Sequence, residues 1–189
     1  MVTVRRSARA RRTTVSSPSL TRWGGAAACL AGLSYGAWGY LDDPGSPAFV
    51  MGTIVPVLAL ATPALFLGGL VGLYSRLGGG GGPLQRIGLL VGLLGTVLGV
   101  IHELGWWESD WWPLLFASLA AVGSGTVSED ASRLLGAVVL ASGALGLVSL
   151  LTDPAFPGVL VPTQPVHVAF AALFCMSCVA WGWALFRRI

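Results

Sequence analysis

The stretch from Arg86 to Trp107, which reads RIGLLVGLLGTVLGVIHELGWW, restricts the fold of this chain more than any other part of it. It carries no charged residue between Ile87 and Ile101. About 22 helical residues at about 1.5 Å each reach about 33 Å, and the hydrocarbon core of a bilayer is about 30 Å thick. We therefore interpret this stretch as a transmembrane helix.

The composition of the whole chain agrees with a membrane setting. The sequence is 54% hydrophobic and only 10% charged, whereas soluble domains carry about 25% charged residues. The net charge of +3 gives no indication of nucleic-acid binding, and the three cysteines lie in apolar surroundings, unlike the disulfide framework of a secreted protein. All basic residues are Arg, and Asn is absent, which is typical of GC-rich codon usage in a bacterial genome.

Charge-free runs divide the chain into six helical segments. The predicted fold is an all-α, polytopic transmembrane bundle, with an Arg-rich cytoplasmic tail at residues 1–22 and a six-helix transmembrane domain at residues 23–189. Pro56 and Pro63 fall inside the second segment and should kink it. The expected helices cover residues 23–41, 51–74, 86–107, 113–127, 134–152 and 166–186.

The arginines predict the orientation of this bundle. With six helices and the N-terminus inside the cell, all 11 Arg lie on the inner side, and six of the eight acidic residues lie outside. This distribution obeys the positive-inside rule. It places both termini in the cytoplasm and the protein in the bacterial cytoplasmic (inner) membrane. Two alternatives for the Arg-rich tail remain open: it binds anionic lipids, or it is a transit peptide directing the protein to an organelle membrane.

The segment GGLVGLYSRL followed by QRIGLLVGLLGTVLG resembles small six-span membrane proteins of actinobacteria and other GC-rich bacteria. The resemblance runs from the second predicted helix through the third. It implies the same topology and the same kind of source, and it implies no particular activity.

Small residues repeat along one face of three predicted helices, at steps of four, three and four. In lipid, close backbone approach across small residues is a main source of helix association. We therefore predict that the first, third and sixth helices form an inner layer; with 27 glycines in the chain, chance repetition is the alternative. The residues are Gly25, Cys29, Gly32 and Gly36; Gly88, Gly92, Gly95 and Gly99; and Ala171, Cys175, Cys178 and Gly182.

Four tryptophans and a cysteine pair have both structural and functional interpretations. Trp106, Trp107, Trp111 and Trp112 are typical of an aromatic belt at the membrane interface, with a carbohydrate-stacking platform as the alternative. Cys175-Met-Ser-Cys178 has the spacing of a redox pair. It lies halfway along the sixth helix, where desolvation suppresses the thiolate, so we interpret it as packing.

The two histidines carry the most specific functional hypothesis. His102 ends the glycine face of the third helix, and His167 begins the small-residue face of the sixth, so both would lie in the outer leaflet. An ionisable residue inside a membrane is a candidate functional site, and two histidines on facing helices are one way to hold haem or another metal. The structural alternative is that each histidine hydrogen-bonds a carbonyl, Glu103 or interfacial water.

No catalytic residue is assigned from the sequence. We expect a multi-pass membrane protein that is a non-enzymatic accessory, scaffold or sensor module. The alternative is a redox protein that binds haem or a metal between His102 and His167. Its expected partners are the lipid bilayer and another membrane protein or a second copy of the chain.

Overall fold

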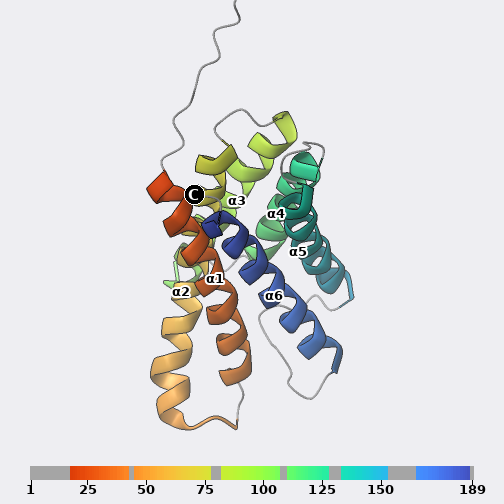
Figure 1. The fold of residues 1–189 in the computed structure, drawn as a ribbon. Coiled ribbons are helices and arrows are strands. Elements are labelled where there is room, and N and C mark those ends of the chain that lie inside the picture. The colour runs from red at the N-terminus through yellow and green to blue at the C-terminus, as the bar shows by residue number, and fades with distance from the viewer. Residues whose placement is uncertain are drawn as a thin grey trace, which may run out of the picture.

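The computed structural model describes residues 18–42, 45–77, 82–106, 110–127, 133–152 and 165–187. Within this part of the chain there are six α-helices, one π-helical turn and no strand (Figure 1). The predicted all-α fold is confirmed. The elements are α1 (Pro18–Leu41), η1 (Val50–Ile54), α2 (Val55–Leu77), α3 (Pro83–Glu103), α4 (Trp112–Val127), α5 (Arg133–Thr152) and α6 (Pro165–Arg187).

The helix bounds agree with the expected segments to within a few residues, except at the end of α3, which stops at Glu103 and not at Trp107, and at the start of α1. This helix begins at Pro18, so the expected boundary between tail and domain, after Arg22, falls inside it. Proline suits the first position of a helix because its missing N–H has no partner to lose there. The same reason applies to α3, which begins at Pro83 after the extended residue Gly82.

Each helix packs on its neighbours in the sequence, and α6 closes the bundle by packing on α1. The pairing of α1 with α6 is antiparallel, because Gly25 lies beside Gly182 and Gly32 lies beside Cys178. Figure 1 shows the N-terminal end of α1 and the C-terminal end of α6 at the same end of the bundle.

The expected inner layer of α1, α3 and α6 is wrong in one respect. α1 and α6 do pack together, but the main neighbours of α3 among the described residues are α2 and α4. The glycine face of α3 lies along α4: Gly88 is beside Val122, and Gly95 is beside Leu114. α4, the next helix in the chain, covers this face, so α6 does not pack on it.

The closest helix approaches are backbone against backbone at glycines. A Cβ atom on Gly24 of α1 would overlap the backbone of Gly72 on α2, and one on Gly143 of α5 would lie 2.6 Å from the carbonyl oxygen of Phe116 on α4. Real Cβ atoms do not approach so closely, so these positions admit only glycine unless the helices separate. The sequence does contain one pattern that indicates the contact between α1 and α2: Gly68 and Gly72 have the Gly-x-x-x-Gly spacing typical of close helix packing.

Two prolines shape the start and middle of α2. Pro56 follows the π-helical turn η1, in which the N–H of Val55 donates to the carbonyl of Val50. Pro63 lies inside the helix and cannot donate to the turn before it. Beside it, Thr62 Oγ1 donates to the Leu58 carbonyl at 2.8 Å and lies 3.0 Å from Ser34 Oγ of α1. The polar groups next to the proline therefore also tie α1 to α2.

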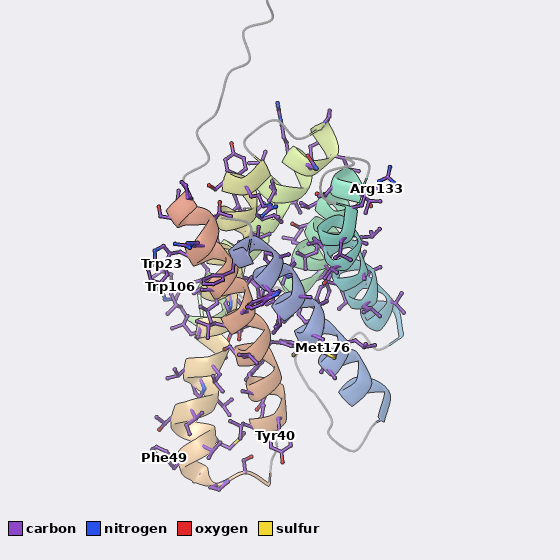
Figure 2. All side chains as sticks on the ribbon, viewed as in Figure 1. Trp23, Tyr40, Phe49, Trp106, Arg133 and Met176 are labelled. Atoms are coloured by element: carbon purple, nitrogen blue, oxygen red, sulfur yellow. The ribbon has the colours of Figure 1, made fainter. Side chains whose placement is uncertain are left out.

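Many large apolar side chains lie on the outside of the described helices, and Figure 2 shows Trp23, Tyr40 and Met176 on the periphery. Within the part of the chain that the structure describes, two helical segments are long and apolar enough to cross a membrane, Val50–Arg76 and Pro83–Glu103. The helix α4 differs from the others, since the large apolar residues exposed on the described helices come from α1, α2, α3, α5 and α6. It presents Trp112, Leu115, Phe116, Leu119 and Val122 to the interior.

The glycine contacts predict the direction in which a Gly→Ala change shifts thermal stability. Alanine is the better helix former by about 1 kcal/mol, so a Gly→Ala change should stabilise a helix unless space is lacking. We expect Gly143→Ala to lower the thermal unfolding midpoint in detergent, because its Cβ meets the α4 backbone. The matched control is Gly52→Ala in η1, where a Cβ meets nothing within 4 Å. Equal midpoints for the two variants would contradict the glycine contact.

Candidate functional site

An aromatic core joins four helices in the interior of the bundle. It consists of rings from α1, α2, α4 and α6 that touch edge to face, stacked or tilted, at separations favourable for aromatic pairs. The ring centroids of Tyr35 and Trp112 are 5.1 Å apart, and those of Tyr35 and Phe174 are 5.2 Å apart. The aromatic core comprises Tyr35, Trp38, Phe66, Trp112, Phe116 and Phe174, all buried.

The start of α4 positions its share of these rings. The backbone N–H of Trp112 donates to Asp110 Oδ1 at 3.1 Å, which fixes the chain where the helix begins. The spacing of four residues then places Trp112 and Phe116 on one face, with ring centroids 5.7 Å apart. On the other side, Gly146 of α5 leaves room for the Phe116 ring, since a Cβ there would overlap it.

Several polar side-chain atoms in the interior of the described bundle have no hydrogen-bond partner. Among the described residues, Tyr35 Oη, Trp111 Nε1, Ser118 Oγ and Trp181 Nε1 are buried and have no hydrogen-bond partner. A buried polar group without a hydrogen bond costs about 1–3 kcal/mol. These atoms do not supply a nucleophile next to a base, and within the described residues no three His, Cys, Asp or Glu side chains could hold a metal ion.

The structure does not bring the helices of the two histidines together. His102 lies half-buried in the last turn of α3, and His167 lies in the first turn of α6 but its side chain is outside the described part. Neither helix is a main neighbour of the other. Trp106, just beyond α3, lies on the far side of the view from the start of α6 (Figures 1 and 2). The arrangement therefore gives the expected haem or metal site no support.

The four expected interface tryptophans have different positions. Trp106 is 77% exposed, and Trp107 lies outside the described residues. Trp111 and Trp112 are only 2% and 4% exposed, so they are interior residues and not part of an exposed belt. Trp111 can be buried because Gly99 of α3 has no side chain. A Cβ on Gly99 would lie 2.6 Å from the Trp111 ring, which occupies that space.

The cysteine pair of α6 faces α1. Cys178 is fully buried against Gly32, and Cys175 Sγ lies where a Cβ on Gly36 would approach it to 3.0 Å. Cys29, Cys175 and Cys178 are all free thiols in the structure. Their place at the α1–α6 contact, where they meet backbone across glycine, agrees with a packing role.

At the opposite end of the bundle from the termini, Asp42 follows α1. Burial raises the pKa of this carboxyl above its ordinary value. The carboxyl is close enough to Glu103, at the end of α3, for the two charges to interact. A raised pKa means that folding disfavours the carboxylate, so Asp42 reduces stability at neutral pH and ceases to do so as the pH falls through its folded pKa.

No protein family model, curated protein or solved structure matches this chain. The functional argument therefore depends on the residues themselves.

Sequence reasoning did not identify the aromatic core. Tyr35, Phe66, Phe116 and Phe174 stand in apolar runs in which nothing separates an inward ring from a lipid-facing one. Glycines opposite a large ring, such as Gly99 and Gly146, mark where rings fit, but they can be recognised only once the helix partners are known.

The core predicts a contrast between two variants. Tyr35→Phe removes a hydroxyl that has no partner among the described residues, so we expect a change in unfolding free energy within about 0.5 kcal/mol, or a small gain. Phe116→Ala removes a fully buried ring that contacts two others, and we expect a loss of about 3 kcal/mol. Thermal unfolding in detergent measures both changes in unfolding free energy. A loss on Tyr35→Phe as large as on Phe116→Ala would indicate that the hydroxyl binds something essential.

Proposed function

We propose that this chain is a six-span integral membrane protein of the bacterial cytoplasmic membrane, with both termini in the cytoplasm. In this proposal it acts as a non-enzymatic accessory, scaffold or sensor module whose interior maintains the fold. Its outward apolar faces bind lipid and other membrane-embedded partners. The observation that carries the proposal is the exposure of large apolar side chains along most helices.

The outer surface supports the membrane location. On α3, Ile87, Leu90, Leu94 and Val97 are all exposed and follow one another at steps of three and four, which aligns them on one helix face. In water such a contiguous apolar face marks an interaction site or an aggregation hazard. In a bilayer the same face meets hydrocarbon and costs nothing.

The arginines support the orientation. Arg22, Arg76, Arg86 and Arg133 all lie near helix ends that the antiparallel packing places at the end of the bundle where α1 starts and α6 ends. Arg76 Nη1, at the end of α2, donates to the Ala184 carbonyl near the end of α6. A bundle with its arginines at one end fits the positive-inside rule with that end in the cytoplasm. An organelle membrane is the alternative location.

The interior supports a structural module over an enzyme. Ring contacts of the aromatic core and glycine contacts between backbones fill the centre of the described bundle. Some of its side-chain hydrogen bonds join helix to helix, among them Gln85 to Thr126 and Ser142 to Ser177. Such bonds between membrane helices stabilise by about 0.6 kcal/mol each on average. Because packing contacts fill the interior, partners bind on the outer surface.

Cysteine labelling tests the topology. In a background with Cys29, Cys175 and Cys178 replaced by Ala, single cysteines at Ser46, Ser109 and Thr163 should react from outside intact cells with a membrane-impermeant maleimide. Cysteines at Gly80 and Ser128 should react only after permeabilisation. Labelling of Gly80 in intact cells would contradict the six-span model.

Photo-crosslinking tests the module role. A photoreactive amino acid at Leu90 of α3, Val148 of α5 or Met176 of α6 samples three outward faces in living cells. We expect a discrete heavier adduct from one or two faces, because a specific partner covers a specific face. The absence of any discrete adduct from all three would argue against a scaffold or accessory role, and an adduct of twice the chain mass would identify a second copy.

A further inference from the structure

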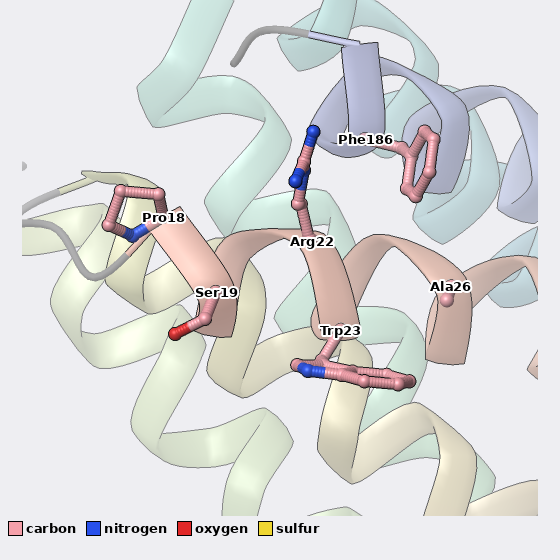
Figure 3. A pocket seen from close by; sticks show the side chains of 6 residues that line it. All are labelled: Pro18, Ser19, Arg22, Trp23, Ala26 and Phe186. Carbon is pink, nitrogen blue, oxygen red and sulfur yellow. The ribbon is translucent and has the colours of Figure 1, made fainter.

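A hollow lies on the surface where α1 begins and α6 ends (Figure 3). Its volume is about 490 Å³, and it is open to the outside. Five of its lining residues come from the first turns of α1, at spacings that place them on one side of that helix, and the sixth comes from α6. They are Pro18, Ser19, Arg22, Trp23, Ala26 and Phe186.

The hollow combines a positive charge with an apolar floor. Among the described residues, Arg22 supplies the charged side chain of its wall, and Trp23, Ala26 and Phe186 supply apolar surface. In the view of Figure 3, Arg22 extends from α1 on the side of Phe186, and the Trp23 ring extends in the opposite direction. An arginine guanidinium matches the geometry of a phosphate group, to which it donates two parallel hydrogen bonds.

The apolar floor continues away from the hollow along both helices. On α1, Leu30 and Leu33 are exposed and lie on the same side as Trp23 and Ala26. On α6, Met176, Val179 and Trp183 are exposed and lead toward Phe186 at steps of three and four. α1 and α6 pack against each other, so these two apolar faces border one contact between helices.

We propose that this hollow binds an acidic phospholipid of the cytoplasmic leaflet. Arg22 binds the phosphate of the headgroup, Trp23 lies at the level of the headgroup, and the acyl chains follow the outer faces of α1 and α6. Charge complementarity favours an acidic over a zwitterionic lipid, because the 22 residues from the N-terminus through Arg22 contain six arginines and no acid. The inference rests on the proposed orientation, which puts this end of the bundle at the cytoplasmic leaflet.

Lipid binding to the full-length protein in detergent, followed by native mass spectrometry, tests the proposal. Phosphatidylglycerol and phosphatidylethanolamine with identical acyl chains are titrated separately, and we expect phosphatidylglycerol to bind more tightly. Arg22→Gln should weaken phosphatidylglycerol about fivefold, from about one basic residue's contribution near an anionic lipid, and leave phosphatidylethanolamine unchanged. Excess inorganic phosphate should not displace the lipid, because it lacks the acyl chains.

Two further variants make the test specific. Arg133→Gln removes the same charge from an exposed site at the start of α5, which Figure 2 shows away from Trp23, and should leave both affinities unchanged. Ala26→Phe fills the floor of the hollow without altering charge and should weaken both lipids. Thermal unfolding of each variant without added lipid checks that it is folded. If Arg22→Gln does not fold, lipid binding by the Ala26→Phe variant still tests the site.

Three results would overturn the lipid site: equal affinity for the two lipids, equal losses on Arg22→Gln and Arg133→Gln, or displacement by inorganic phosphate. The binding measurement in detergent does not depend on topology, and cysteine labelling in cells does not depend on lipid. If cysteine labelling follows the expected pattern but acidic lipid is not preferred, the lipid site is refuted and the proposed topology is not. Inverted labelling with the preference intact would refute the proposed orientation and keep the binding site in the hollow.

Discussion

Backbone contact between helices is the interaction on which the rest of this structure depends. In the proposed membrane setting, lipid tails are as apolar as leucine, so the burial of apolar side chains gives helices little reason to associate, and van der Waals packing must supply it. Packing gains most where backbones touch, and only glycine permits that. Gly24 against Gly72, Gly25 against Gly182 and Gly143 against Ala120 provide such contacts on three different helix pairs.

Close approach at glycines also determines where large side chains go. Where two backbones touch, no ring fits, so the aromatic side chains collect where the helices diverge or where a glycine leaves space. The Trp111 ring lies over Gly99, and the Phe116 ring lies over Gly146. α4, the shortest of the six described helices, carries Phe116 and Trp112 into contact with α6 and α1, which are not among its main neighbours. Glycine contacts and the aromatic core are thus complementary parts of one packing solution.

The two ends of the bundle have different chemistry as a result. At the end opposite the termini, the carboxyl of Asp42 interacts with Glu103, and burial raises the Asp42 pKa. At the end where α1 starts, Arg22 borders an apolar hollow. A bilayer with an anionic cytoplasmic surface stabilises arginine on that side. The proposed orientation and the proposed lipid site therefore depend on charges at the same end of the bundle.

The sequence by itself determined the class of fold, the six helical segments and the glycine-rich face of α3, because length, hydropathy and the 3.6-residue period are properties of single helices. Tertiary structure alone decided which faces meet. The face of α3 could have met α6, which would have brought His102 toward His167, but it packs on α4. It also decided that Trp111 and Trp112 are interior while Trp106 is exposed. Hydropathy cannot make that distinction, because the lipid and the interior of a membrane bundle are equally apolar.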